Sequence, residues 1–293
     1  MVKLSNNLFW RFAPFIFVIF WSGGYSFAKL GLKYIEPMTM LAVRYGIAAL
    51  MLFPFLVLLT KRWPKTWYHW FSLVFTGFLI QCIYFGLTYL AFKKGMNAGS
   101  AAVILSLQPV LVAAFTMFFN GVSGGRYIWI GLLIGFVGVL LATISNNSLG
   151  PAPWTAVTLV VSALLGMTIA TLFEQWHELK THPAVAGFVQ YLVGFIVLSA
   201  IAKTSEKMVI DWRPELFISL TYLIVCNSII SVGIYIGLLQ RGNATSISSL
   251  FYLVPPFAVI IAWIVLGEAV TPLAIVGFGL STLGVYIINN NIN

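Results

Sequence analysis

The stretch NAGSAAVILSLQP at residues 97–109 returns further along the chain as NATSISSLFYLVP at residues 243–255. Both stretches are apolar, and each places a proline, Pro109 or Pro255, near the middle of a segment long enough to cross a bilayer. The same offset, without a gap, pairs identical residues in the neighbouring segments: Tyr89/Tyr235, Asn97/Asn243, Ala98/Ala244, Ser100/Ser246, Leu107/Leu253, Gly121/Gly267, Gly131/Gly277, Gly138/Gly284 and Val139/Val285. A repeat of this length indicates a duplicated domain and not a solenoid unit.

The composition indicates an integral membrane protein. Hydrophobic residues make up 60% of the chain and charged residues 8%, against roughly 25% charged in soluble domains, and the mean hydropathy is +0.98. The net charge of +9 is spread over segment ends instead of forming one basic face, so nucleic acid is not expected as a partner. Two cysteines, Cys82 and Cys226, are too few for a disulfide framework.

Apolar stretches predict ten transmembrane helices, five in each half. They lie near residues 12–32, 37–60, 67–91, 97–120, 127–145, 153–175, 183–202, 214–239, 243–266 and 271–289. The sequence NNSLGPAP at residues 146–153 predicts the linker, so the two repeats are expected at 1–146 and 147–293. Because each half crosses an odd number of times, the second repeat must be inverted, an architecture that is typical of secondary transporters.

The first apolar segment follows Lys3 and Arg11, as in a secretory signal, but the spans after it favour a retained first helix. Basic residues are nearly balanced between the two sides of the predicted topology. Those in the N-terminus and in the second connection favour a cytoplasmic N-terminus. We therefore expect a multi-pass protein of the bacterial inner (plasma) membrane with both termini cytoplasmic.

The two prolines predict a kink at related places in the two halves, since proline breaks the helical hydrogen-bond ladder. Pro256 follows Pro255 directly. Broken helices at membrane depth commonly line a transport pathway, which makes Gln108 and Tyr252, next to the prolines, candidate solute ligands. The alternative is a packing kink, because transmembrane helices tolerate proline.

Arg44 lies inside the second predicted span, where an ionised guanidinium needs a partner or a wet cavity. A carboxylate or phosphate of the solute would suit its planar fork. The alternatives are snorkelling to the interface and bonding to the carbonyls at a helix end. Gln190 is its counterpart in the other half. Gln81 and Asn227 also correspond by the offset and lie mid-span, where each could bind a solute or join two helices.

Aromatic side chains complete the predicted solute site, which favours organic solutes over inorganic ions. The candidates are Trp21, Tyr25, Tyr84 and Trp176. Every acid falls at a span end or in a connection, so any coupling group would be Glu174, Glu268 or the solute itself. No cofactor or catalytic residue is predicted. No metal site is predicted either, since His177 and His182 have no further metal ligands nearby.

The repeated residues resemble the EamA-like branch of the drug/metabolite transporter superfamily. They are Tyr89, Ala98, Ser100, Pro109, Gly131 and Gly138 in the first half, and Tyr235, Ala244, Ser246, Pro255, Gly267-Glu268, Gly277 and Gly284 in the second. Trp21-Ser22-Gly23 and Arg44 after Pro37 also look like the opening of that family. Val122 departs from the pattern, because it stands where the Gly-Glu acid is expected in the first half.

The resemblance implies ten helices in two inverted repeats that move amino acids, amphiphiles or other metabolites, mostly outward in bacteria. It places helices 1, 3, 4, 6, 8 and 9 around the cavity and helices 5 and 10 at the centre. No acid stands in the middle of the first helix, where small drug-efflux relatives carry one, which argues against proton-driven export of cations on their model.

The sequence therefore predicts a transporter of a small organic solute, such as an amino acid or amine, that works by alternating access and exports it. The bilayer is the other expected partner, and the oligomeric state is open, with a monomer favoured. A receptor or scaffold is the alternative class. An intramembrane hydrolase would need the serine of Gly121-Val122-Ser123-Gly124, which lies in a connection.

Overall fold

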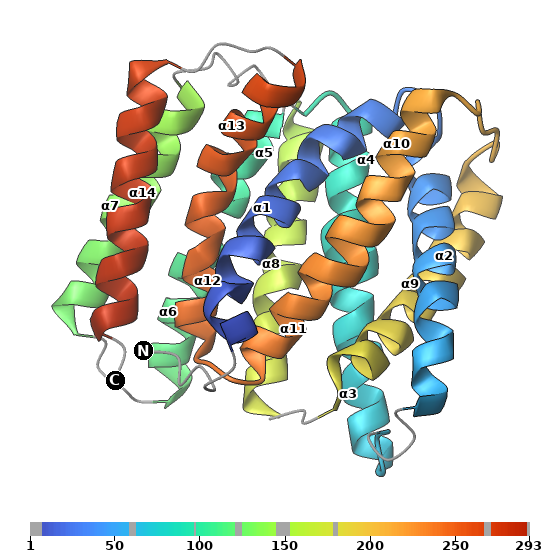
Figure 1. Ribbon diagram of the computed structural model, residues 1–293, viewed down its shortest axis with the longest axis horizontal. Coiled ribbons are helices and arrows are strands. Elements are labelled where there is room, and N and C mark those ends of the chain that lie inside the picture. Colours follow the sequence, from blue (N-terminus) through green and yellow to red (C-terminus); the bar gives the residue numbers. More distant parts are fainter. Residues whose placement is uncertain are drawn as a thin grey trace.

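The computed structural model describes residues 8–58, 63–96, 98–120, 125–144, 153–177, 181–266 and 271–291. Within these ranges the chain is helical apart from connections and one isolated bridge between Ile35 and Ile210. The helices stand side by side. The start of the first helix and the end of the last lie on the same side of the molecule (Figure 1). The prediction of an all-α protein is confirmed.

The helices follow one another in this order: α1 (Leu8–Gly31), α2 (Pro37–Leu58), α3 (Trp67–Gly77), η2 (Phe78–Gly86), α4 (Leu87–Lys93), α5 (Ala98–Leu105), α6 (Gln108–Asn120), α7 (Arg126–Ile144), α8 (Trp154–Trp176), α9 (Pro183–Ser205), α10 (Pro214–Tyr222), η3 (Leu223–Val232), α11 (Gly233–Leu239), α12 (Ala244–Ser249), η4 (Leu250–Leu253), α13 (Val254–Leu266) and α14 (Pro272–Asn291).

Seven helical rods in the described residues are long and apolar enough to cross a membrane. Two of them, Trp67–Lys93 and Pro214–Leu239, are continuous rods built from an α-helix, a π-helix and a second α-helix. Two shorter apolar helices are Val103–Phe119 and Arg126–Leu141. The protein is thus a multi-pass integral membrane protein, while the count of ten spans stays a prediction.

Two pairs of related residues reveal how the repeats are placed. Ser281 Oγ donates to the carbonyl of Gly135, its own counterpart in the duplication, at 3.4 Å. Tyr45 stacks on its counterpart Tyr191 with ring centroids 5.5 Å apart. A residue that contacts its own counterpart lies next to the axis that exchanges the repeats, so the pseudo-two-fold axis passes near both contacts.

That axis runs along the length of the molecule. The Gly135–Ser281 contact joins α7 to α14 and the Tyr45–Tyr191 contact joins α2 to α9, and these helix pairs lie at opposite ends of the long axis (Figure 1). An axis roughly perpendicular to the helices reverses their direction, so the two repeats are inverted, as predicted.

Small residues allow α7 and α14 to pack closely. A Cβ atom at Gly138 would lie 2.4 Å from the Ser281 nitrogen and 2.6 Å from the Gly277 carbonyl oxygen, and one at Gly284 would lie 2.5 Å from the Gly135 nitrogen. The predicted pairing of these helices is therefore present. The family resemblance suggested that the pair lies at the centre. It lies instead at one end of the molecule, where the pseudo-two-fold axis passes between α7 and α14 (Figure 1).

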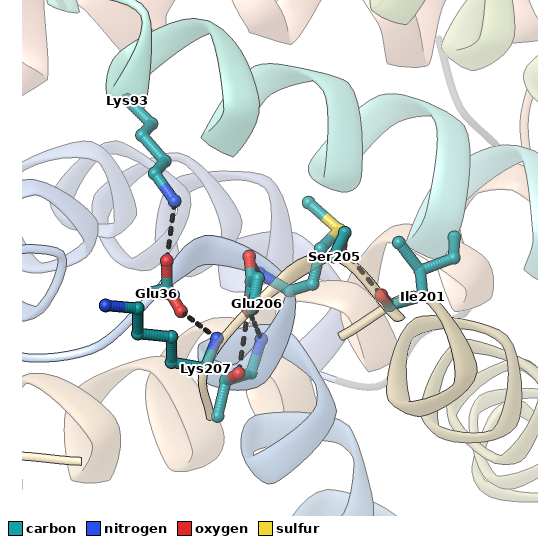
Figure 2. Close-up of polar contacts among 8 residues, drawn as sticks. Glu36, Lys93, Ile201, Ser205, Glu206 and Lys207 are labelled. Carbon is teal, nitrogen blue, oxygen red and sulfur yellow. Dashed lines mark hydrogen bonds and ion pairs between the residues drawn. The ribbon is translucent and has the colours of Figure 1, made fainter. Parts of the chain in front are cut away.

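At one end of the helices, the connection after α9 closes over the start of α2. The Glu206 carboxylate accepts hydrogen bonds from the amides of Met38 and Thr39, each at 2.8 Å, and from the Thr39 hydroxyl at 2.7 Å (Figure 2). Amides in the first turn of a helix have no partner inside the helix, and a carboxylate there also complements the helix dipole. Glu206 therefore caps a helix of the opposite repeat.

Glu36 ties the same end together. Its carboxylate receives Lys93 Nζ at 2.8 Å and the amide of Lys207 at 2.7 Å (Figure 2). The Lys93 hydrogen bond and the Lys207 amide lower the pKa of Glu36 below its usual value. Since the carboxyl is partly exposed, the ion pair itself adds little stability.

Several predicted features lie outside the described residues. These are the linker at 146–152, the Gly121 to Gly124 connection and Glu268. The two histidines can be placed: His177 Nδ1 lies 2.7 Å from the Phe173 carbonyl oxygen, and His182 accepts from the Ala184 amide at the start of α9.

Replacing Gly138 with alanine should destabilise the protein, because the new methyl group forces α7 and α14 apart. Overpacking of this kind costs about 1–3 kcal/mol. The measurement is the melting temperature of the purified protein in detergent. Gly279→Ala, on α14 with no atom within 4 Å of the added Cβ, is the matched control. Equal melting temperatures for the two variants would contradict the close packing described.

Candidate functional site

Arg44 is fully buried on α2, next to Tyr45 and the pseudo-two-fold axis. Its guanidinium donates from Nε to Ser228 Oγ at 2.7 Å, from Nη1 to Tyr89 Oη at 3.1 Å and from Nη2 to Asn227 Oδ1 at 2.5 Å. The side chain is therefore held within the helix bundle, and the snorkelling alternative is wrong.

Among the described residues, no acid pairs with this cation. The acids Glu36 and Asp211 pair instead with Lys93 and Arg213. All three partners of Arg44 are neutral oxygen atoms, and its guanidinium also lies over the rings of Phe85, at 4.7 Å, and Tyr45, at 5.3 Å. Burying a guanidinium is costly unless it is paired with a charge, so the site lacks an anion.

Two π-helices position the partners of Arg44. η3 carries Asn227 and Ser228, and η2, at the corresponding place in the first repeat, carries Tyr84 and Phe85. The i→i+5 turns of π-helices are rare and occur mostly at functional sites. The sequence gives no periodic signal for them, because apolar residues surround both segments.

Aromatic rings enclose a pocket beside the guanidinium. It is lined by Trp21, Gly24, Tyr25, Ala28, Arg44, Tyr84, Phe85, Thr88, Tyr89, Phe92 and Asn227. Tyr25 and Tyr84 share a hydrogen bond at 3.2 Å, and the Trp21 and Phe85 ring centroids are 5.7 Å apart. The pocket holds about 20 Å³, which is room for roughly one water molecule. It is collapsed in this arrangement.

Gly24 lets α1 approach the pocket closely. A Cβ atom there would lie 2.6 Å from the Asn227 amide nitrogen, which donates to the Phe20 carbonyl at 3.3 Å. The opening segment of the chain therefore contacts Asn227 directly, and this contact orients the Asn227 oxygen that receives Arg44.

A larger cavity, of about 1160 Å³, leads toward Arg44 from the end of the molecule where the chain begins. Its outer part is lined by Lys65, His69, Thr181, His182, Gln240 and Arg241, and its inner part by Tyr191 and Ser228. Ser228 also receives Arg44 Nε, so the cavity and the guanidinium share one residue. The large cavity thus opens at this end, whereas the opposite end carries the Glu36 and Glu206 contacts.

A third hollow, of about 540 Å³, lies at that opposite end and is basic. Lys29, Lys33 and Lys93 line it together with Glu36. Phe92 lines both this hollow and the Arg44 pocket, and Lys29 Nζ lies 5.9 Å from its ring centroid. Phe92 is therefore common to the basic hollow and the Arg44 pocket.

Five of the nine predicted solute ligands meet in the Arg44 pocket: Trp21, Tyr25, Arg44, Tyr84 and Asn227. The pocket residues that sequence reasoning did not select are Gly24, Ala28, Phe85, Thr88, Tyr89 and Phe92. Tyr89 could have been selected from the sequence, since it is one of the residues that are identical in the two repeats.

The other four predicted ligands lie elsewhere. Gln81 is buried on η2 beside Gly194 of α9, and Gln108 donates to Thr171 Oγ1 at 3.1 Å. Tyr252 packs on Gly135 of α7, and Trp176 is 43% exposed at the end of α8.

Each helix that contains one of the predicted kinks is preceded by an interruption of the regular helix. In the first repeat α5 ends at Leu105 and α6 begins at Gln108, just before Pro109. In the second, the 3-10 helix η4 separates α12 from α13, which begins just before Pro255 and Pro256. Ser106 and Ser249 each donate to a backbone carbonyl three residues earlier, so hydroxyl groups satisfy part of the disrupted backbone.

The sequence did not reveal that Glu174, a candidate coupling group, is buried. It lies within the last turn of α8, where an interfacial position is the simple expectation, yet its side chain is only 3% exposed. Neither carboxylate oxygen has a hydrogen-bond partner.

A comparison with protein families matches the chain twice. The model of the EamA-like transporter family covers residues 8–144 and 154–290. The two matches correspond to the two inverted halves of the structure and together take in almost all of the described helices.

Similar proteins come from plants and bacteria. A WAT1-related chloroplastic protein of Arabidopsis thaliana is 28% identical over 94% of this chain and 68% of its own. The uncharacterized inner membrane transporter YedA of Escherichia coli is 22% identical over 94% and 89%. A protein of Salmonella typhimurium described as a probable amino-acid metabolite efflux pump is 24% identical over 94% and 93%.

A crystal structure shows the same fold, with a TM-score of 0.77 over 94% of both chains at 17% identity. The family and the YedA protein are described as transporters and the Salmonella protein as a probable efflux pump, which argues against the intramembrane hydrolase that the sequence left as an alternative. This chain belongs to the EamA-like transporter family.

Proposed function

We propose that this protein is a secondary transporter that moves a small organic solute with a carboxylate group across the membrane by alternating access, and that Arg44 binds the carboxylate. The observation that carries the proposal is the buried guanidinium, which has no acidic partner in the part of the chain that the structure describes. An amino acid or a related metabolite has the required group.

The hydrogen bonds of Arg44 leave room for such a ligand. A guanidinium has five N–H donors, and three of its bonds are accounted for by Ser228, Tyr89 and Asn227. A carboxylate could take the remaining donors in a bidentate pair and would supply the missing negative charge. The basic hollow lined by Lys29, Lys33 and Lys93 would attract the same anion toward the pocket.

The rings around Arg44 favour an organic solute. Trp21, Tyr84 and Phe85 offer apolar faces, while Tyr25 and Tyr89 add hydroxyl groups at the pocket. Such a mixture of a few polar groups within an aromatic lining is typical of small-molecule sites. An inorganic anion would gain nothing from most of this surface.

Inverted repeats supply the two conformations that alternating access needs. In this arrangement the Glu36 and Glu206 contacts hold one end together, and the large cavity reaches Ser228 from the other. Exchanging the conformations of the two repeats about the pseudo-axis would open the first end and close the second. The collapsed Arg44 pocket would expand during this change.

We further propose that the protein exports its solute across a bacterial inner membrane, with both termini in the cytoplasm. The names of two relatives support this setting: one is described as an inner membrane transporter and another as a probable efflux pump for amino-acid metabolites.

Solute counterflow in proteoliposomes tests the function. Vesicles preloaded with an unlabelled carboxylate solute should accumulate the labelled form, and a panel of amino acids, other organic acids, amines and nucleosides should show exchange only among solutes with a carboxylate. Protein-free vesicles are the control. Exchange of amines or nucleosides in preference to every carboxylate would overturn the proposed solute class, and no exchange by folded protein would overturn transport.

The Arg44→Lys variant tests the binding role. Lysine keeps the charge but loses the planar fork, and hydrogen bonds to charged groups are worth about 1.5–3 kcal/mol each. We expect at least about tenfold weaker solute binding, measured as the concentration that raises the melting temperature of the protein. Arg213→Lys, at an exposed ion pair, is the matched control. Equal affinities for the two variants would rule out Arg44 as the carboxylate ligand.

A further inference from the structure

Glu174 stands apart from the other acids of the described chain. Glu36, Glu206 and Asp211 each accept hydrogen bonds or pair with a cation, and Glu215 is exposed. Glu174 is buried on α8, and both of its oxygens lack partners. An ionised carboxylate without donors is strongly unfavourable in such a place, so the neutral acid is the form that suits this arrangement.

A polar cluster lies one turn away. Thr171 Oγ1 receives Gln108 Nε2 at 3.1 Å and lies 2.6 Å from the Tyr235 hydroxyl. Thr171 precedes Glu174 by three residues and so shares its face of α8. Gln108 Oε1, also buried, has no partner. Polar groups from α6, α8 and α11 therefore meet beside the carboxyl, and one of them, Gln108, has an oxygen without a partner among the described residues.

No cation neutralises Glu174 within the described residues. Tyr235 on α11 is the ionisable side chain that interacts with it electrostatically, and α5, α6 and α12 carry no ionisable side chain. The remaining helices that pack on α8, namely α3, η2 and α4, contribute Tyr68, His69, Cys82, Tyr84, Tyr89 and Lys93. His177 follows on the same helix and contacts the Phe173 carbonyl, while Lys93 is paired with Glu36.

The duplication relates Glu174 to a residue that lines the Arg44 pocket. The offset that pairs Tyr45 with Tyr191 and Gly135 with Ser281 also pairs Ala28 with Glu174 and Tyr25 with Thr171. Ala28 and Tyr25 line the Arg44 pocket. When the repeats exchange conformations, α8 takes the place that α1 has here, and Glu174 then lines the equivalent pocket.

We propose that Glu174 is a proton-binding site: it holds one proton in the arrangement seen here and releases it to water when the exchange exposes it. This inference rests on the proposed alternating access and identifies the proton as the ion that is coupled to transport. The step moves one proton between the Glu174 carboxyl and water and changes no other bond. Solute movement and proton movement are thereby linked through one residue of the second repeat.

Infrared difference spectroscopy of the purified protein tests the protonation without knowledge of the solute. At neutral pH, where exposed carboxyl groups are ionised, the wild-type protein should show the C=O stretch of a carboxylic acid. Glu174→Gln should lack it, and Glu215→Gln, at an exposed acid, should keep it. Absence of the band from the wild type, or its persistence in Glu174→Gln, would overturn the site.

Proteoliposomes with a trapped pH indicator test the coupling. Addition of a solute that exchanges in counterflow should change the internal pH in wild-type vesicles and not in Glu174→Gln vesicles. Counterflow without any pH change in the wild type would leave transport established and overturn proton coupling. A pH change of equal size in the two proteins would assign the coupling to another group.

Discussion

The contacts across the pseudo-two-fold axis are the constraint on which the rest of the structure depends. Glycines bring α7 and α14 together at one end of the molecule, and Tyr45 stacks on Tyr191 at the other. Each contact joins a residue or helix to its own counterpart, so together they fix the inverted relation of the repeats. The Arg44 pocket and the large cavity are lined in part by α2 and α9, whereas α7 and α14 contribute no lining residue to either.

The fold is symmetric, but its buried charges are not. Arg44 of the first repeat corresponds to Gln190 of the second, and Glu174 of the second corresponds to Ala28 of the first. The first repeat thus contributes a buried basic group and the second a buried acid, and neither group is present at the corresponding position of the other repeat. Because these groups stand at places that are not equivalent by the axis, exchanging the conformations of the repeats changes the charge presented to the pathway.

The fold could be predicted from the sequence because its signals are local or periodic. The offset between Pro109 and Pro255 revealed the duplication, and the odd count of spans in each half required inversion. Arg44 and Asn227 could be selected because a polar side chain inside a membrane is energetically costly and usually has a functional or structural role. The π-helices η2 and η3 could not be predicted, since an extra residue in a helical turn leaves no mark in a uniformly apolar segment.

The site was predicted less well, because depth along a span does not determine what surrounds a side chain. Trp176 and Glu174 lie in the same turn of α8, yet the tryptophan is 43% exposed and the glutamate 3%. Position along the helix is nearly the same for both, and only the neighbouring helices distinguish them. Tyr252 shows the same effect, since it adjoins a helix break but packs on Gly135.

The three partners of Arg44 explain how one side chain could respond to both ends of the molecule. Tyr89 and Asn227 belong to the collapsed pocket, whereas Ser228 also lines the large cavity at the other end. A shift of η3 relative to α2 would therefore lengthen the Ser228 and Asn227 bonds together and leave the Tyr89 bond, from α4, in place. The guanidinium would then have further free donors at the moment when the pocket expands, which is when the proposed carboxylate has most to gain from binding them.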